Sequence, residues 1–157
     1  MRPTDKKPNY GIDAPGVIRN IFITALITGI LSVVAIYVHV SFIQVKPETL
    51  LSISISCVFS ASLMLLYSLY GKYKYREKLL NLVSWNGREN VLDIGTGKGL
   101  LMVGAATRLS EGRSYGIDIW NKQDLTGNNA EQAMINAERE GVADKIEIEN
   151  ENVTDMS

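Results

Sequence analysis

Two long stretches of the chain contain no charged side chain. Residues 20–45 and 49–71 lack Asp, Glu, Lys and Arg throughout. At about 1.5 Å per helical residue, each stretch outruns a hydrocarbon core about 30 Å thick. The first is too long for the apolar part of a signal peptide, and no small-residue cleavage site follows it. Because only residues 46–48 separate the two stretches, the pattern predicts an antiparallel transmembrane hairpin within residues 17–71.

The second stretch contains a pattern that also fits a strand. Apolar residues and serines alternate over residues 51–57, and a period of two is typical of a strand. An isolated strand in lipid leaves its backbone polar groups unsatisfied, so the membrane context favours a helix. Small residues recur at a spacing of four, which lets helices approach closely. We expect these residues to pack within the hairpin, with a dimer as the alternative; they are Ala25, Gly29, Ser52, Ser56 and Ser60.

The distribution of positive charge predicts an orientation. The chain up to Arg19 carries four Lys or Arg residues, the link carries Lys46 alone, and residues 72–78 carry four more. Under the positive-inside rule, this distribution places both termini in the cytoplasm. We therefore expect an integral membrane protein with two spans and a polar cytoplasmic tail over residues 1–16. The tail is expected to be irregular and solvated, with a specific interfacial element over residues 9–19 as the alternative.

The remainder of the chain, residues 72–157, is much richer in charge and alternates between strand and helix patterns. Its apolar periodicity and turn residues predict a helix–βαβαβ order, which indicates a parallel sheet with right-handed crossovers and an α/β fold class. The expected helices span 75–83, 97–109 and a segment from Asn128 or Asn129 to Glu140, and the expected strands span 90–94, 114–119 and 145–149.

The totals remove several function classes. The formal net charge is −1, which gives no global electrostatic case for binding nucleic acid. Cys57 is the only cysteine, so an internal disulfide and a cysteine-rich metal site are excluded. His39 is the only histidine, which excludes a histidine cluster. His39 fits a place at the membrane interface, with a proton relay as the alternative. No metal site is expected.

Residues 91–99 read V-L-D-I-G-T-G-K-G and combine a strand with a glycine-rich turn. The apolar run over residues 91–94 indicates a strand buried on both faces, and Asp93 interrupts it. The start of the following helix offers free N–H groups and a partial positive charge, which suit a ligand with a polar or anionic end. Glycine permits a positive φ and lets ligand atoms approach the backbone. The glycines of this turn are Gly95, Gly97 and Gly99.

Three ligand classes use such a turn. A P-loop needs Ser or Thr after its lysine, whereas Gly99 follows Lys98 here. A dinucleotide fingerprint needs its third glycine one residue after Gly99. The pattern D-x-G-x-G-x-G fits residues 93–99 in full, and its carboxylate suits a cationic ligand group better than a pyrophosphate. The stretch resembles the nucleotide-binding motif of class I S-adenosylmethionine-dependent methyltransferases, and the alternatives are the dinucleotide fingerprint and a structural glycine turn.

The second predicted strand ends in Asp118, beside the strand that carries Asp93. A carboxylate at this position can accept hydrogen bonds from both hydroxyls of a ribose. NAD enzymes and methyltransferases share this feature, so it supports a nucleoside ligand without choosing between them. The structural alternative is an aspartate that starts a helix or a turn. Ile119 and Trp120 follow, and in the family the residue after the acid often packs on the adenine. Trp120 either does so or covers the sheet edge.

The resemblance extends over residues 79–156 and implies that residues 72–157 form the first half of a Rossmann-like methyltransferase fold. It implies S-adenosyl-L-methionine as cofactor, with the glycine loop at its methionine part and Asp93 near its cationic end, partly through water. Where the family usually places an acid against the adenine amino group, this chain has Asn152. The cofactor-binding residues that the resemblance implies are Asp93, Gly95, Thr96, Gly97, Gly99, Asp118, Ile119, Asn152 and Val153.

The catalytic and substrate residues of the family usually follow a fourth strand, which we do not find in this sequence. The chain therefore resembles a methyltransferase truncated after its cofactor half, and catalytic residues stay unassigned. The implied activity is methyl transfer at a membrane to an unidentified acceptor: a lipid, a small molecule or a protein. We expect no turnover by the chain as it stands. The alternative is a non-catalytic, membrane-tethered nucleoside-binding or interaction module. Membrane lipid and the acceptor are the expected partners, and no nucleic acid is.

Overall fold

The computed structural model describes residues 7–38, 46–120, 129–152 and 154. The chain divides into two compact units, each with its own set of contacts. Residues 12–72 form a helical hairpin. The residues up to 11 join those from 73 onward in an α/β unit, so the second unit draws on both sides of the hairpin in the sequence.

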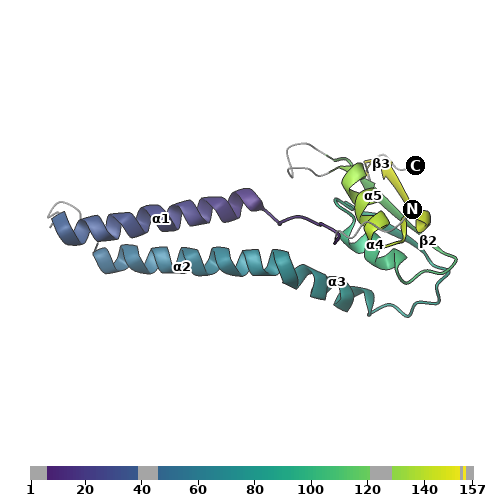
Figure 1. The fold of residues 1–157 in the computed structure, drawn as a ribbon, viewed down its shortest axis with the longest axis horizontal. Coiled ribbons are helices and arrows are strands. Elements are labelled where there is room, and N and C mark those ends of the chain that lie inside the picture. The colour runs from purple at the N-terminus through teal and green to yellow at the C-terminus, as the bar shows by residue number, and fades with distance from the viewer. Residues whose placement is uncertain (1–6, 39–45, 121–128, 153, 155–157) are drawn as a thin grey trace. The chain divides into compact units, whose positions relative to one another are not determined.

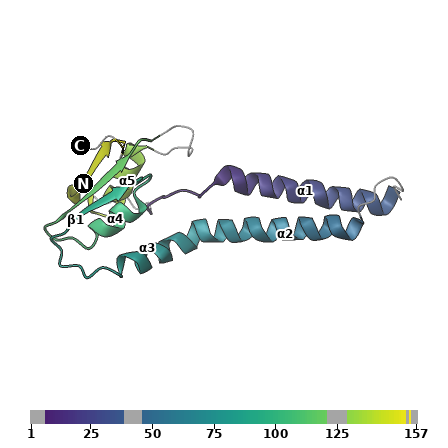
Figure 2. The same cartoon turned by 180° about the vertical axis from the view of Figure 1, so that it is seen from behind.

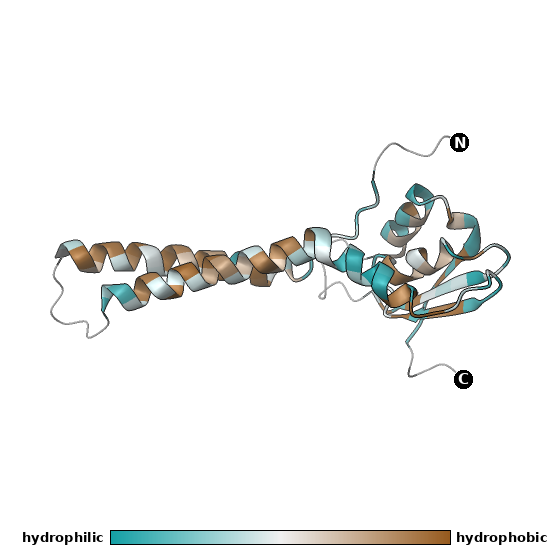
Figure 3. Cartoon of the chain, turned by 90° about the horizontal axis from the view of Figure 1, so that it is seen from below, coloured by the Kyte–Doolittle hydropathy of each residue, from teal (hydrophilic) through white to brown (hydrophobic). Residues whose placement is uncertain are grey.

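The hairpin consists of two long apolar helices. Helices α1 (Pro15–Val38) and α2 (Pro47–Leu66) run side by side in opposite directions (Figure 1, Figure 2), and their surfaces are mostly apolar (Figure 3). The segments Pro15–Tyr37 and Pro47–Leu80 are long and apolar enough to cross a membrane, yet only 11% and 6% of their apolar windows are buried in the protein. Such uncovered apolar surface fits lipid better than the core of a soluble protein.

The boundaries of these helices differ slightly from the sequence prediction. Helix α1 begins at Pro15, two residues before the expected start, because proline suits the first helical turn, where its missing N–H is not needed. Helix α2 begins at Pro47, so most of the expected link is already helical. The alternating residues 51–57 lie within α2, which confirms the helix over the strand. His39 lies outside the described residues.

Small residues do pack between the two helices, but the serines are not the expected ones. The hydroxyl of Ser54 donates to the carbonyl of Ala25 at 2.7 Å, and a Cβ on Gly29 would lie 3.1 Å from the Ser54 Oγ. The packing prediction is therefore right for α1 and wrong for α2. Because the inward face of α2 runs through Ser54 and the fully buried Ala61, the serines at the predicted spacing are exposed: Ser52, Ser56 and Ser60.

A polar cluster closes the end of the hairpin near the start of α1. Helix α2 continues through a π-helical turn, η1 (Tyr67–Gly71), toward α3 (Lys72–Leu80). Asp13 receives a hydrogen bond from the Ser68 hydroxyl at 3.2 Å and pairs with the Lys72 ammonium at 3.3 Å. Lys72 is only 5% exposed. A buried charge requires a partner, so Asp13 ties the chain ahead of α1 to the end of α2.

The α/β unit confirms the predicted alternation of strands and helices. Its sheet is parallel, with strand order β1-β2-β3. Helices α4 and α5 contact each other and lie on the same face of the sheet (Figure 3). Asn129, one of the two expected starts of this helix, caps α5 by accepting from the Gln132 N–H at 2.8 Å, and Gly141 follows with φ +72°. The elements are β1 (Asn90–Ile94), α4 (Leu100–Ala106), β2 (Arg113–Asp118), α5 (Ala130–Arg139), η2 (Ala143–Lys145) and β3 (Ile146–Asn150).

Strand β1 is not buried on both faces, contrary to the sequence prediction. Leu92 and Ile94 are 49% and 55% exposed. Among the described residues β1 pairs only with β2, and both helices cover the opposite face. An apolar run predicts that a strand is buried on both faces only if other elements cover both faces of the sheet. In the described part of the chain, α4 and α5 cover one face, and the other face leaves Leu92 and Ile94 exposed.

The N-terminal segment is not a solvated tail where the structure describes it. Residues 7–11 have no regular secondary structure, as expected, but Tyr10 is only 6% exposed. Its ring belongs to the core of the α/β unit, which combines residues of α4, α5 and β3. The expectation of a solvated tail over residues 1–16 is therefore wrong for this segment. The other core residues are Met102, Val103, Ala106, Ala133, Ala137, Val142 and Ile146.

Candidate functional site

A glycine loop joins β1 to α4 at the carboxyl end of the sheet. Gly95, Gly97 and Gly99 have φ values of +74°, +55° and +82°, a backbone region that favours glycine. The N–H groups of Gly95 and Thr96 both donate to the Ile117 carbonyl, at 2.8 and 3.1 Å. The loop is thereby folded back over the end of β2.

The glycines at the two ends of this loop meet different surroundings. A Cβ on Gly99 would lie 3.0 Å from the Met102 methyl and 3.1 Å from a Val103 methyl, so Gly99 permits close packing of the loop on α4. A Cβ on Gly95 would meet nothing within 4 Å. Gly95 is exposed, so a ligand can approach its backbone.

Asp93 supports the loop from the strand below. Its Oδ2 accepts from the Thr96 hydroxyl and from the Met102 N–H, both at 3.0 Å, and thus caps the first turn of α4. Among the described residues no cationic side chain pairs with this carboxylate, and no hydrogen bond reaches its Oδ1. Burial raises the pKa of Asp93, and the nearby Asp118 charge adds to the rise, while the two hydrogen bonds oppose it.

Asp118 joins the loop to the segment after β2. Its Oδ2 accepts from the Gly97 N–H and its Oδ1 from the Trp120 N–H, both at 2.8 Å. The Trp120 indole N–H donates to the Gly97 carbonyl at 3.3 Å, so Trp120 contacts the loop itself. A carboxylate offers about four lone-pair directions. Asp118 can therefore keep both contacts and still accept from a ligand.

The predicted site residues do not all converge. Asp93, Thr96, Asp118 and the three loop glycines gather at the carboxyl ends of β1 and β2. Ile119 follows β2 and is 55% exposed. Asn152 is exposed, and its Oδ1 accepts from the Thr154 N–H at 3.2 Å. Val153 lies outside the described residues. Within the described part of the chain, no group of three or more His, Cys, Asp or Glu could hold a metal ion.

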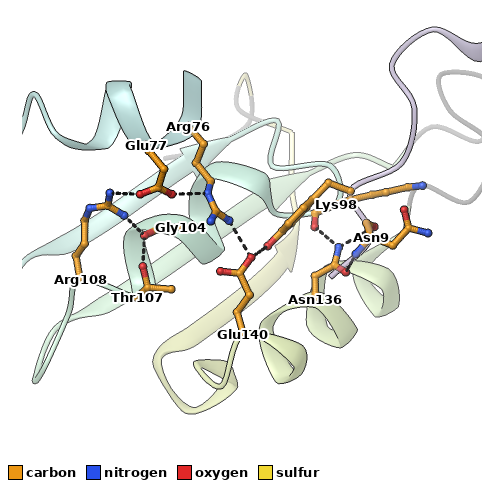
Figure 4. Close-up of polar contacts among 10 residues, drawn as sticks. Asn9, Arg76, Glu77, Lys98, Gly104, Thr107, Arg108, Asn136 and Glu140 are labelled. Carbon is orange, nitrogen blue, oxygen red and sulfur yellow. Dashed lines mark hydrogen bonds and ion pairs between the residues drawn. The ribbon is translucent and has the colours of Figure 1, made fainter. Parts of the chain in front are cut away.

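Sequence reasoning missed Asn136, which reaches the loop from α5. This side chain is fully buried, and its Nδ2 donates to the Lys98 carbonyl at 3.0 Å (Figure 4). The signal was present in the pattern, because Asn136 interrupts the small apolar stripe of Ala133 and Ala137 on α5. A buried amide in such a stripe needs hydrogen-bond partners, and the loop supplies one of them.

No protein-family model matches the chain, and no curated protein matches it significantly. The loop and its two carboxylates are the features of this chain that point to a ligand.

Proposed function

We propose that this chain is a membrane-tethered, S-adenosylmethionine-dependent methyltransferase that transfers a methyl group to an unidentified acceptor. One observation carries the proposal. A glycine loop with open space above Gly95 lies between two carboxylates, Asp93 and Asp118, at the end of a parallel sheet. Open α/β sheets bind their ligands beyond the carboxyl ends of the strands.

The electrostatics favour a cationic nucleoside over a pyrophosphate. Asp93 has no cationic partner among the described residues, and Asp118 adds a second negative charge nearby. A sulfonium or ammonium group would offset this charge, whereas a pyrophosphate would be repelled. The negative charge of the two aspartates therefore favours S-adenosylmethionine over NAD as the ligand.

The proposed roles follow from these positions. Asp118 accepts from the two ribose hydroxyls, the loop backbone binds the methionine part, and Asp93 acts near the cationic end. Methyl transfer depends largely on holding the methyl group in line with its acceptor. The proposal therefore assigns cofactor-binding roles to these residues and assigns no catalytic residue.

The membrane tether is part of the proposal. We propose that α1 and α2 cross the membrane and that both termini lie in the cytoplasm, on the basis of apolar length and the Lys and Arg distribution. Tyr10 and Tyr73, which flank the hairpin in sequence, lie in edge contact with ring centroids 5.9 Å apart. Two spans return the chain to its starting side, which this contact requires, and a single span does not. The tether favours an acceptor at the membrane surface, such as a lipid.

A second candidate is a non-catalytic, membrane-tethered nucleoside-binding or interaction module. The observation that favours it is the exposed apolar residues of β1, Leu92 and Ile94, on the strand that ends the described sheet. An exposed apolar edge strand is a template for pairing with another chain. Ligand binding without turnover would favour this candidate.

The test compares ligands and variants in the full chain, purified in detergent. Calorimetric titration should show binding of S-adenosylmethionine and S-adenosylhomocysteine and none of NAD. Asp118→Ala should weaken binding roughly tenfold or more, because unpaired polar groups cost about 1–3 kcal/mol. Asp144→Ala, at an exposed site in η2, is the matched control and should bind normally.

Turnover separates the two candidates. The chain is incubated with S-adenosylmethionine labelled in its methyl group and with a membrane extract, and the label is followed into lipid, protein and small molecules. Label transfer that depends on Asp118 supports the methyltransferase, and it would also overturn the expectation of no turnover that follows from the unassigned fourth strand. Tight NAD binding, or no nucleoside binding at all, would overturn the proposed ligand.

A further inference from the structure

Residues 7–11, which we name the strap, are held on the α/β unit by contacts with residues far along the chain. The backbone of Asn9 makes two hydrogen bonds with the Asn136 side chain: its N–H donates to Oδ1 at 2.8 Å, and its carbonyl accepts from Nδ2 at 3.1 Å. Arg139 adds a hydrogen bond to the Lys7 carbonyl at 3.3 Å. A side-chain amide thus pairs with Asn9 as a neighbouring strand would.

Asn136 connects this strap to the glycine loop. Its Nδ2 donates both to the Asn9 carbonyl and to the Lys98 carbonyl, while its Oδ1 accepts from the Asn9 N–H (Figure 4). Gln132 completes the set with a longer bond of 3.4 Å to Oδ1. The fully buried amide therefore uses its whole bonding capacity to join two backbone segments.

Tyr10 fixes the strap next to this connection. Its hydroxyl donates to Glu140 Oε1 at 2.6 Å, and Arg76 Nη1 donates to the same oxygen at 2.8 Å. The Arg76 guanidinium lies 5.9 Å from the centre of the Tyr10 ring, within cation–π range. Arg76 of α3 and Glu140, the residue that follows α5, thus hold the Tyr10 side chain, and the strap has specific contacts on the α/β unit.

Gly11 makes the last contact between the strap and the loop. Its φ is +75°, and its N–H donates to Asn9 Oδ1 at 2.9 Å, which forms a tight turn. A Cβ on Gly11 would lie 2.8 Å from the Lys98 ammonium nitrogen, so the Lys98 side chain passes directly over this glycine. Lys98 is therefore held at its carbonyl by Asn136 and covered at its side chain by the strap.

We propose that the strap is a positioning element for the glycine loop, and that Asn136 is the positioning residue that transmits its effect to Lys98. The choice of ligand in this inference rests on the proposed function, whereas the contact between the strap and the loop does not. A loop with three glycines is costly to order. Holding Lys98 from outside removes part of that cost before a ligand arrives. Because coupling between two sites is reciprocal, a ligand in the loop should also stabilise the strap.

The first measurement needs no ligand. Hydrogen exchange is followed in peptides that cover residues 95–100 of the full chain in detergent. Asn136→Asp keeps an acceptor for the Asn9 N–H but sets a carboxylate against two carbonyls, so exchange in the loop should accelerate roughly tenfold. The matched control is Asn90→Asp, at an exposed position at the amino end of β1, which should leave exchange in the loop unchanged.

The second measurement uses S-adenosylhomocysteine as the probe. Its affinity should fall roughly tenfold in Asn136→Asp, and in the unaltered chain it should slow exchange at residues 9–11. If the probe does not bind but exchange in the loop still responds to Asn136→Asp, the proposed ligand fails and the strap stands. If Asn136→Asp does not fold, Asn9→Pro decides the question: it leaves Asn136 in place and removes the Asn9 N–H, together with the side-chain acceptor of the Gly11 N–H. Unchanged exchange in the loop of a folded strap variant would overturn the inference.

Discussion

The hairpin and the α/β unit satisfy their polar groups in different ways. In the hairpin, several hydroxyls bond to the backbone one helical turn earlier, as Thr24 does to Asn20 and Ser56 to Ser52. In the α/β unit, a key hydrogen bond joins Asn9 and Asn136, which are 127 positions apart. Each hairpin helix is therefore close to self-sufficient, a condition that a helix must meet if it crosses lipid. The α/β unit depends instead on contacts between distant segments.

The largest test of this comparison is the same substitution in each region. A Cβ on Gly112 in the α/β unit would lie 2.1 Å from the Glu89 carbonyl oxygen, a backbone atom that cannot move aside easily. A Cβ on Gly16 in α1 would meet nothing within 4 Å. Gly112→Ala should therefore lower the free energy of unfolding by about 3 kcal/mol, and Gly16→Ala should not lower it.

Urea titration provides the measurement: tryptophan fluorescence follows the α/β unit, to which Trp85 and Trp120 both belong, and circular dichroism follows the helices of the hairpin. An equal shift of the midpoint in both variants would show that the two regions do not differ as described.

The second test probes the distant contacts. Tyr10→Phe keeps the buried ring but removes the hydroxyl that donates to Glu140 at 2.6 Å. A hydrogen bond to a charged group contributes about 2 kcal/mol, so the free energy of unfolding should fall by about that amount. Tyr115→Phe is the matched control in β2, where no hydrogen bond of the hydroxyl is seen among the described residues. Similar decreases in the free energy of unfolding in the two variants would show that the hydrogen bond to Glu140 does not stabilise the fold.

The third test compares two carboxylates. Asp13 in the hairpin unit has Lys72 as a cationic partner, whereas Asp93 has none among the described residues. Burial raises the pKa of Asp93, so the folded chain binds this proton at a higher pH than the unfolded chain does. Ionised Asp93 therefore reduces stability at neutral pH, and a cationic ligand should offset that effect.

Affinity for S-adenosylmethionine should accordingly fall about fivefold as the pH drops through the raised pKa of Asp93. Calorimetric titration over that pH range measures it. Asp93→Asn should bind more weakly at neutral pH and lose this pH dependence. If the affinity of Asp93→Asn still depends on pH in this range, another titrating group causes the dependence.

The smallest expected effect lies between the hairpin helices. Ser54→Ala removes the hydrogen bond to the Ala25 carbonyl, and Ser56→Ala removes only a bond within α2. Hydrogen bonds between helices in lipid contribute about 0.6 kcal/mol, so Ser54→Ala should weaken the hairpin by that amount and Ser56→Ala by less. Unfolding in a titration with denaturing detergent, followed by circular dichroism, compares the two. A larger effect of Ser56→Ala would favour the alternative in which Ser52, Ser56 and Ser60 pack against a second chain in a dimer.

Features encoded within a short stretch of sequence were predictable. The apolar length of α1 and α2, the Asn129 cap and the turn at Gly95 each depend on neighbouring residues alone, and the structure confirms them. The Asp93 bond to the Met102 N–H is of the same local kind, although the pattern did not indicate it. The exposure of Leu92 was not predictable, because it depends on which distant elements cover each face of β1.

The role of Asn136 was beyond sequence reasoning for a related reason. The sequence indicated a helix over this region, but nothing nearby identified the partner of a buried amide. That partner, Asn9, belongs to a segment whose composition is typical of a loose tail. Pattern analysis assigns a segment by its own residues, whereas the strap acquires its structure from α5.

The position of Tyr10 also has a consequence for the order of events during synthesis. Tyr10 leaves the ribosome before its partner Glu140, which follows 130 positions later. At about 5–20 residues per second, the strap waits roughly ten seconds before α5 exists. During that interval the strap has no place to dock. The α/β unit therefore completes its core only after α5 has been made, with a segment that was made before the hairpin.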